Sequence, residues 1–421
     1  MARFDSLDGW LSWQEQFHPR PIDLGLERVA GVYARLAPSP RKIPTITVAG
    51  TNGKGSCVAY LEAIYRAQGY RVGAYTSPHI LKYNERIRID GQPVSDEAIC
   101  AAFERIDAVR NDTSLSYFEF GTLASLELFD RNEVDVQILE VGLGGRLDAV
   151  NIVDPDVAMV TTIAIDHIDW LGHTEEAIGL EKAGIFRRAT PAIIGDQQVP
   201  ISLIDAARDK QANLLQIGRS FDYRKQINGW DWFGDGLKLT SLPEPALKGE
   251  HQFRNAASVI MAINCLQTRL PVDVSAIKQG LTTVQLKGRF QLIPGDIPVL
   301  LDVGHNPQAV QTLLEYLERY FPSARIHAVF AMMKDKDIQG VLAMMRKRVA
   351  HWYLAPLKNP RAADEALLKD FFYQQDINNL NHGYADFLAA FDDARHYAKP
   401  GDLILIFGSF FLVSEYLSHF S

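Results

Sequence analysis

The sequence has few cysteines, no long apolar run and no excess of positive charge. Only three cysteines occur among 421 residues, and Cys57, Cys100 and Cys265 lie far apart. This spacing fits neither a disulfide framework nor a zinc site, so we expect reduced thiols in a cytoplasmic protein. No segment approaches the length of a membrane span, and residues 1–10 lack the apolar centre of a signal peptide.

The net negative charge of the protein argues against anionic macromolecules as binding partners. Lysine and arginine number 43 against 51 aspartates and glutamates, which gives a formal net charge of -8. Because long basic runs are also missing, we expect neither nucleic acid nor an anionic membrane to be the main partner. Hydrophobic residues make up 47% of the chain and charged residues 22%, as in ordinary globular proteins. We expect a soluble monomer.

The most informative segment is a glycine-rich turn between a predicted strand and a predicted helix. Residues 43–48 are apolar and β-branched, as in a buried strand, whereas residues 58–69 have the apolar spacing of a helix. In the turn, Gly50, Gly53 and Gly55 let the backbone approach a polyphosphate, and Lys54 meets its negative charge. The turn therefore predicts a nucleoside triphosphate ligand.

The spacing of this turn differs from that of the common P-loop. The common form has four residues between its glycines and a hydroxyl residue directly after the lysine. Here only Thr51 and Asn52 separate Gly50 from Gly53, and Ser56 lies two places after Lys54. For the turn alone, a glycine-rich helix start that binds no ligand is the alternative interpretation.

Short apolar segments alternate with helical ones along the chain. In the first two thirds the further predicted strands are residues 71–75, 134–141, 157–163 and 191–194. The alternation predicts a P-loop NTPase-like α/β domain with a parallel sheet wrapped by helices. The pattern restarts with predicted strands at residues 299–303, 326–330, 352–355 and 403–407.

The length of the chain and this restart predict two domains, since one hydrophobic core rarely supports 421 residues. We expect an ATP-binding domain over residues 1–287 and a smaller Rossmann-like α/β domain over residues 288–421. A short hinge is predicted at about residues 286–297.

Polar residues follow three of the predicted strands. Ser77 follows strand 71–75, strand 134–141 carries Glu140 near its end, and His167 follows strand 157–163. Ligands of open parallel sheets bind at the carboxyl ends of the strands, so these side chains predict a Mg²⁺ site beside the triphosphate. Imidazole is an unusual Mg²⁺ ligand, and a structural hydrogen-bonding role for His167 is the commoner outcome when that residue is considered alone.

An ordered series of motifs runs nearly from end to end of the chain. It comprises GTNGKGS (50–56), TSPH (76–79), LEVGLGGRLD (139–148), DH (166–167), EKAGI (181–185), HQ (251–252), NAA (255–257), GRFQ (288–291), DVGHNP (302–307), DKD (335–337) and GSF (408–410). Together these motifs resemble the folylpolyglutamate synthase and dihydrofolate synthase family, which is related to the Mur ligases.

The resemblance implies ATP-dependent amide formation between a folate-type carboxylate and the amine of L-glutamate. Dihydropteroate and tetrahydrofolates are the implied acceptors, and ATP activates their carboxylate as an acyl phosphate. The implied cofactors are Mg²⁺ at two sites and a monovalent cation. We favour a bifunctional enzyme; a monofunctional folylpolyglutamate synthase is the alternative.

The resemblance also implies roles for individual residues. The ATP site takes Thr51, Asn52, Gly53, Lys54, Gly55, Ser56, Asn255, Arg289 and Asp302, and the metal site takes Ser77, Glu140 and His167. The implied catalytic residues are Lys54, Glu140, His167 and Lys182, and the implied glutamate contacts are His305 and Ser409.

Lys182 has two interpretations. From the sequence alone, a solvated helix lysine beside Glu181 is favoured. In this family the matching lysine is commonly carbamylated, so the resemblance implies a carbamylated Lys182 that supports the second magnesium.

The acceptor pocket is implied by two segments and a loop. They are Asp23, Leu24, Gly25 and Leu26; Ser116, Tyr117, Phe118 and Glu119; and Arg146 with Asp148. These segments resemble the dihydropteroate pocket of bifunctional bacterial members, in which the aromatic residues stack on a pterin. As alternatives, Leu24 and Leu26 pack a helix start, and residues 117–120 belong to the core.

Two other functions each account for part of this pattern. A Mur-type cell-wall ligase should carry an additional N-terminal domain, whereas here the glycine-rich turn starts only about fifty residues into the sequence. A nucleotide-operated switch explains Lys54 and Ser56 but leaves Glu140, Lys182 and the second domain unexplained.

Overall fold

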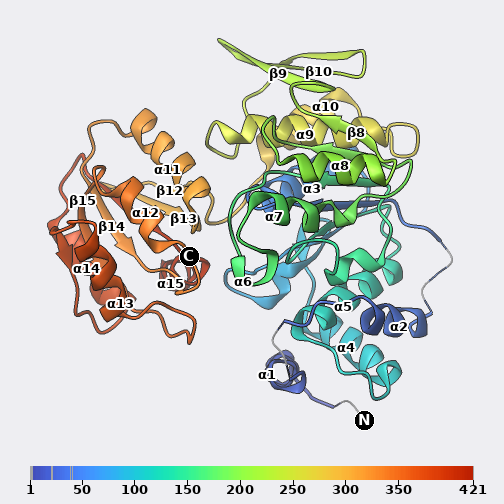
Figure 1. Ribbon diagram of the computed structural model, residues 1–421, viewed down its shortest axis with the longest axis horizontal. Helices are drawn as coiled ribbons and strands as arrows, with labels where there is room; N and C mark the ends of the chain where they lie inside the picture. The colour runs from blue at the N-terminus through green and yellow to red at the C-terminus, as the bar shows by residue number, and fades with distance from the viewer. Residues whose placement is uncertain (1–2, 20–21, 38, 40, 421) are drawn as a thin grey trace. The chain divides into compact units, whose positions relative to one another are not determined.

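The computed structural model describes residues 3–19, 22–37, 39 and 41–420 (Figure 1). It divides into two compact units. The first runs up to Ala164 and includes Leu171–Ala246 and Phe253–Val284, and the second contains Ile165–Trp170, Leu247–Gln252 and the chain from Gln285 onward. Two short segments of the N-terminal sequence, one of them carrying His167, therefore belong to the second unit.

The first unit is built on an eight-stranded sheet in the order β4-β3-β2-β5-β1-β6-β7-β8. Its parallel strands are β1 (Thr45–Ala49), β2 (Val72–Tyr75), β5 (Val136–Glu140), β6 (Val157–Val160), β7 (Pro191–Ile194) and β8 (Asn213–Gln216). The antiparallel strands β3 (Ile87–Ile89) and β4 (Gln92–Pro93) extend one edge. The predicted parallel sheet is confirmed, and the edge hairpin was not predicted.

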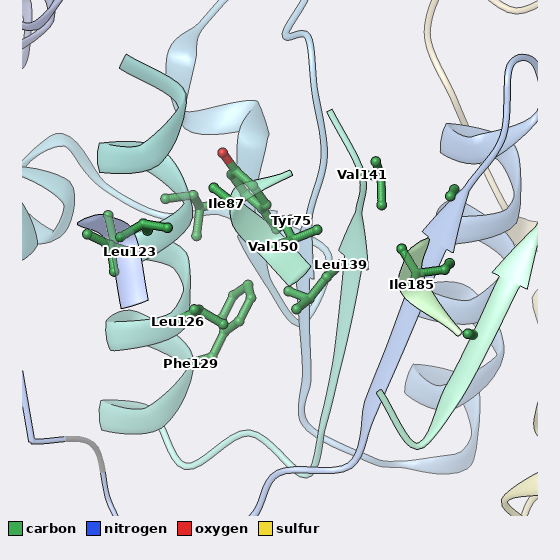
Figure 2. Packing of buried hydrophobic residues seen from close by; sticks show 14 of the residues in the cluster. Tyr75, Ile87, Leu123, Leu126, Phe129, Leu139, Val141, Val150 and Ile185 are labelled. Carbon is green, nitrogen blue, oxygen red and sulfur yellow. The ribbon is translucent and has the colours of Figure 1, made fainter. Parts of the chain in front are cut away.

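Helices cover both faces of this sheet. Helix α5 (Tyr117–Arg131) lies on one face, and Figure 2 shows Phe129 of this helix beside Tyr75 and Leu139 of the strands. Helix α3 (Lys54–Gln68) covers the other face, and α10 (Val274–Thr283) packs against α3. The remaining helical segments that begin in this unit are α1 (Leu7–Phe17), α2 (Glu27–Arg35), η1 (Tyr83–Arg86), α4 (Asp96–Arg110), η2 (Ala149–Ile152), α7 (Glu175–Lys182), η3 (Ala183–Ile185) and α8 (Ile201–Asp209). Two helices begin in segments of the second unit, α6 (Ile168–Leu171) and α9 (His251–Cys265).

A separate three-stranded antiparallel sheet was not predicted. It consists of β9 (Phe221–Gln226), β10 (Gly229–Gly234) and β11 (Leu237–Leu242). Trp230 and Trp232 alternate along β10, are fully buried, and donate their indole N–H groups to Pro243 O at 2.8 Å and Ala257 O at 3.0 Å. This alternation of buried tryptophans was the available sequence signal.

The second unit contains a six-stranded sheet in the order β12-β13-β17-β14-β15-β16. Its strands are β12 (Gln291–Ile293), β13 (Val299–Asp302), β14 (Ile326–Phe330), β15 (Val349–Leu354), β16 (Leu380–Asn381) and β17 (Leu403–Phe407). Its helices are α11 (Pro307–Tyr320), α12 (Ile338–Met345), α13 (Glu365–Gln374), α14 (Phe387–Tyr397) and α15 (Phe410–Phe420). This α/β sheet confirms the predicted class of the C-terminal part.

The predicted hinge needs a correction. Residues 286–297 are not a plain linker, because they contain β12. This strand pairs antiparallel with β13, and Gln291 lies opposite Leu301. Among the helices of the described residues, none combines the length and apolarity that a bilayer crossing requires.

Candidate functional site

The glycine-rich turn between β1 and α3 has a backbone that side chains would obstruct. Gly50 has φ of 142°, and a Cβ added there would lie 1.9 Å from Thr161 Oγ1. Gly53 has φ of 92°, and a Cβ there would lie 2.9 Å from Asn255 Oδ1. Both positions therefore require glycine. The second measurement also places Asn255, a predicted ATP contact, beside the turn.

Hydrogen bonds fix the turn against the segment that follows β6. Thr51 N donates to Thr162 O at 2.7 Å, and Asn52 N donates to Thr162 Oγ1 at 3.1 Å. Thr51 Oγ1 donates to Ala164 O and accepts from Ala164 N, both at 3.1 Å. Because α3 starts at Lys54 without a side-chain cap, the amide end of its dipole lies at this rigid turn, where an anion is favoured.

Two lysine ammonium groups meet one carbonyl of the turn. Lys54 Nζ donates to Gly50 O at 2.9 Å, and Lys182 Nζ donates to the same oxygen at 3.0 Å. Lys182 ends α7 and is only 5% exposed, so its interpretation as a solvated helix lysine is wrong. The positive charge of Lys54 at the start of α3, within a protein of net negative charge, favours a polyphosphate at this turn.

A buried carboxylate lies on the neighbouring strand end. Glu140 ends β5, is 5% exposed, and its Oε2 accepts from Ser77 N at 3.4 Å. The structure thus brings together two of the three residues predicted to bind metal. A buried carboxylate beside a serine fits the oxygen ligands that Mg²⁺ prefers. Within the described parts of the chain, no three His, Cys, Asp or Glu residues form a group able to hold a metal ion.

His167 belongs to a polar cluster of the second unit. Its φ of 52° is left-handed, which is uncommon for a residue other than glycine and often marks a functional position. The imidazole Nε2 lies 3.4 Å from Lys336 Nζ, and the side chain is 38% exposed. No role had been predicted for Lys336, although its DKD motif was part of the resemblance.

Asp166 organises this cluster. It accepts from Lys336 Nζ at 2.6 Å and from Asn306 Nδ2 at 3.3 Å, and His305 Nε2 lies 3.6 Å away. Burial alone would raise the pKa of Asp166, but the hydrogen bond from His305 and the charges of His167 and Lys336 hold that pKa well below its usual value. Asp166 is therefore an anion that orients His305, a predicted glutamate contact.

The other predicted residues of the second unit lie around β13 and the start of α15. Asp302 is buried and accepts from Gly304 N at 2.8 Å and Phe290 N at 3.2 Å. Burial raises its pKa despite the nearby Arg289. The Arg289 guanidinium lies 5.3 Å from the ring of Phe410, and the neighbouring Ser409 is 3% exposed.

The two segments predicted to bind folate meet through one arginine. Arg28 Nη1 lies 2.8 Å from Asp23, and Arg28 Nη2 donates to Glu119 Oε1 at 2.9 Å. Glu119 also accepts from Ser116 N at 2.7 Å, and Ser116 Oγ accepts from Glu119 N at 3.3 Å, which is a capping box at the start of α5. Arg28 was not among the predicted site residues, although it lies only two positions beyond Leu26.

The alternative roles of the two predicted folate segments, packing at a helix start and in the core, apply to some of their residues. Leu26 is the residue before α2, and Leu24 and Gly25 precede it in an irregular segment. Phe120 is fully buried among Trp13 and Phe103, whereas Tyr117 and Phe118 are only partly buried.

The glycine-rich loop after β5 is held by charged residues. Arg146 Nη2 lies 2.9 Å from Glu181 Oε1, and its backbone N donates to Glu181 O at 2.9 Å. Asp148 is 2% exposed and accepts from Leu143 N at 2.8 Å and Val150 N at 3.1 Å. Burial raises the pKa of Asp148 to about 6. In the structure, Asp148 shapes the loop that presents Arg146.

A further group of residues was not predicted. Arg86 Nε donates to His79 Nδ1 at 2.9 Å. Its guanidinium lies 5.5 Å from the ring of Tyr83 and 5.4 Å from the ring of Tyr117. Burial and the charge of Arg86 lower the pKa of His79 to about 4. His79 closes the TSPH motif, which was the only sequence signal for this group.

Comparisons with known proteins identify the family of this chain. Residues 48–263 match the Mur ligase middle domain and residues 288–410 match the Mur ligase glutamate ligase domain. The dihydrofolate synthase/folylpolyglutamate synthase of Escherichia coli is 43% identical over 97% of this chain and 94% of its own length. The Haemophilus influenzae protein of the same name is 39% identical over 97% of this chain and 96% of its own.

Solved structures agree in fold as well. A structure of E. coli FolC in complex with DHPP and ADP has a TM-score of 0.92 at 42% identity and covers 99% of this chain and 97% of that one. A bifunctional folylpolyglutamate synthase/dihydrofolate synthase with Mn, AMPPNP and L-glutamate bound has a TM-score of 0.90 at 42% identity. The match covers 99% of this chain and 98% of that one.

Proposed function

The chain belongs to the dihydrofolate synthase/folylpolyglutamate synthase family of the Mur ligases, and from this premise we propose that it is bifunctional. It joins L-glutamate to dihydropteroate, and it adds further glutamates to the γ-carboxylate of tetrahydrofolates. Both reactions form an amide at the expense of ATP. The observation that carries the proposal is the meeting of Lys54 and Lys182 at Gly50 O.

The chemistry explains why such a turn is needed. A carboxylate resists attack by an amine, so its oxygen first takes the γ-phosphoryl group of ATP and ADP leaves. The amine of glutamate then adds to the acyl phosphate, and phosphate leaves from the tetrahedral intermediate. Two anions must meet in the first step, so the protein contributes positioning and positive charge rather than covalent help.

We assign the nucleotide to the turn and to residues around it. Residues 51–56 bind the phosphates through backbone amides and Lys54, and Asn255, Arg289 and Asp302 are the further ATP contacts. The residues present fit these roles: two glycines occupy conformations that a Cβ would obstruct, and the start of α3 lies at the turn. The proposed phosphate binders therefore act through a rigid backbone.

We assign Mg²⁺ to Ser77, Glu140 and His167. When bound, the ion would neutralise charge on the phosphates during transfer. The contact between Ser77 N and Glu140 Oε2 at 3.4 Å supports this assignment, because it holds the carboxylate at the strand end. A monovalent cation is proposed only on the family resemblance.

We further propose that Lys182 is carbamylated and supports a second Mg²⁺. The burial of Lys182 beside the phosphate turn supports this, because its side chain is 5% exposed and its Nζ lies 3.0 Å from Gly50 O, where an ion would meet the phosphates. Carbon-13 NMR of protein equilibrated with labelled bicarbonate should show a carbamate signal that is missing in Lys182→Arg. A wild-type spectrum without that signal would count against carbamylation.

The acceptor and the amine have separate sets of residues. Asp23, Leu24, Gly25, Leu26, Ser116, Tyr117, Phe118, Glu119, Arg146 and Asp148 are proposed for the pterin substrate, and His305 and Ser409 for glutamate. The bridge from Asp23 through Arg28 to Glu119 supports the first set, because it holds two distant segments together. We also propose a cytoplasmic monomer, in keeping with three free cysteines.

The test is a substrate-dependence assay. Protein is mixed with ATP, Mg²⁺, dihydropteroate and L-glutamate, and ADP release is measured with each component left out in turn. We expect release that depends on both the acceptor and the amine. Replacing dihydropteroate by tetrahydrofolate tests the second activity, and turnover with tetrahydrofolate alone would favour the monofunctional alternative. Glutamate-independent ATP hydrolysis would contradict the ligase assignment.

A further inference from the structure

Arg86 is held on aromatic rings rather than by an acidic partner. Its guanidinium lies within 5.5 Å of the Tyr83 ring and 5.4 Å of the Tyr117 ring, and its Nε donates to His79 Nδ1. The hydrogen bond uses one of five N–H donors. Within the part of the chain that the structure describes, neither terminal nitrogen of Arg86 has an acceptor and no carboxylate pairs with it.

Several other arginines of the first unit pair with carboxylates. Arg88 pairs with Glu62 at 2.9 Å, Arg28 pairs with Asp23 and Glu119, and Arg146 pairs with Glu181. The partner of Arg86 is an imidazole nitrogen that accepts a hydrogen bond and therefore carries no proton. The positive charge of the Arg86 guanidinium can therefore attract an anionic ligand.

The position of Arg86 is fixed at the ligand edge of the first unit's sheet. Its carbonyl accepts from Thr76 N at 2.9 Å, and β3, which follows it, pairs antiparallel with β2. Arg86 is therefore level with the carboxyl end of β2, where Ser77 contacts Glu140. Tyr117, one of its aromatic neighbours, starts α5 and belongs to the proposed acceptor set.

We propose that Arg86 binds the reactive carboxylate of the acceptor and selects acceptors that carry it. A planar guanidinium matches a carboxylate with two parallel hydrogen bonds, and the rings of Tyr83 and Tyr117 set its plane. The carboxylate of dihydropteroate is attached to a flat aromatic ring, which suits the same aromatic surroundings. This inference rests on the proposed function and names a specificity residue for it.

The role in the reaction follows from charge. One carboxylate oxygen forms the bond to the γ-phosphorus while the bond to the β-phosphate oxygen breaks and ADP leaves. Arg86 holds the other oxygen and lowers the repulsion between carboxylate and triphosphate. His79 is a positioning residue, because it orients the guanidinium through Nε.

The test compares dihydropteroate with its carboxamide, which has the same shape and no charge. Binding of each compound to protein saturated with ADP and Mg²⁺ is measured by calorimetry. Wild-type protein should prefer the carboxylate by about 10-fold to 100-fold, as expected for hydrogen bonds to a charged group, and Arg86→Gln should lose this preference. Arg86→Lys keeps the charge without the planar fork, so it should retain part of the preference.

Kinetics and a matched control complete the test. Arg86→Gln should raise the KM for dihydropteroate by at least about 10-fold and leave the KM for ATP unchanged. Arg71→Gln, at the exposed amino end of β2, should behave as the wild type. A folded Arg86→Gln that still prefers the carboxylate would overturn the inference. Failure of the proposed function would instead appear in the wild type, as ADP release that does not depend on glutamate.

Discussion

At the scale of single residues, the site depends on charges that the fold has removed from water. Lysine, aspartate and glutamate are rarely buried without partners. Here Lys182 and Glu140 are 5% exposed and Asp148 is 2% exposed, all at or beside the ends of strands β1 and β5. Burying charged side chains lowers the stability of the fold. Three such residues in one region therefore indicate a functional site that needs charges in fixed positions.

Asp148 gives a prediction for the pH dependence of stability. Its pKa in the folded protein is about 6, above the value of 3.8 for a free side chain, because of burial. The folded state therefore favours the protonated form, and this stability is full below about pH 4 and is lost as the pH rises through 6. Asp148→Asn cannot ionise. The stability gap between wild type and Asp148→Asn should shrink by up to about 3 kcal/mol between pH 4 and pH 7.5.

Urea denaturation at several pH values measures this gap. Asp205→Asn is a suitable control, since Asp205 is 55% exposed and pairs only with the exposed Arg208 among the described residues. Its gap to the wild type should stay nearly constant. A gap for Asp148→Asn that widens as the pH rises would show that Asp148 is stabilised as an anion.

At the scale of elements, several predicted site residues lie at the ends of helices. Helix α3 begins at Lys54, α5 begins beside Ser116 and Tyr117, and α7 ends at Lys182. Rigid placement of these helices on the sheet therefore positions the chemistry. The crossing of α3 and α10 is especially close, because a Cβ at Gly280 would lie 2.4 Å from Ile64 Cγ1 and 2.7 Å from Ile64 Cα.

This crossing gives a prediction with a matched control. Gly280→Ala should destabilise the protein by about 1–3 kcal/mol, since the backbone of α3 must move to admit the methyl group. Gly31, inside α2, has only Arg35 Nη1 near its Cβ position, at 3.7 Å. Gly31→Ala should be neutral or stabilising by up to about 1 kcal/mol. Denaturant unfolding of both variants would decide, and equal effects would disprove the packing argument.

At the scale of the whole molecule, ligand binding should be visible as stability. A nucleotide that binds only the folded protein stabilises it by about 2.7 kcal/mol at a concentration one hundred times its Kd. AMPPNP with Mg²⁺ should therefore raise the melting temperature of the wild type. Lys54→Ala should keep the fold and lose most of this rise, because its ammonium lies at the phosphate turn.

Scanning fluorimetry is sufficient for this measurement. Lys42→Ala is the control, since Lys42 is 64% exposed and precedes β1, away from the turn. Lys42→Ala should show the same nucleotide-induced rise in melting temperature as the wild type. If Lys54→Ala is stabilised by the nucleotide as strongly as the wild type, Lys54 does not bind the phosphates.

The sequence alone determined the class of the fold and the identity of the phosphate turn. The strands of both sheets have local patterns of apolar and β-branched residues, and the turn is a run of neighbouring residues around Lys54. Local patterns are readable because they act over a few residues. The small antiparallel sheet at β9–β11 was not predicted, although the alternation of Trp230 and Trp232 along β10 was a sequence signal for it.

Only the tertiary structure decided which distant groups share a place. Lys182 meets Gly50 across 132 positions of sequence, and Arg28 meets Glu119 across 91. The segment with Asp166 and His167 follows a strand of the first unit yet belongs to the second. Such contacts result from the packing of whole elements, and no periodicity along the chain encodes them. For the same reason, a lysine that the sequence placed in solvent is buried at the phosphate turn.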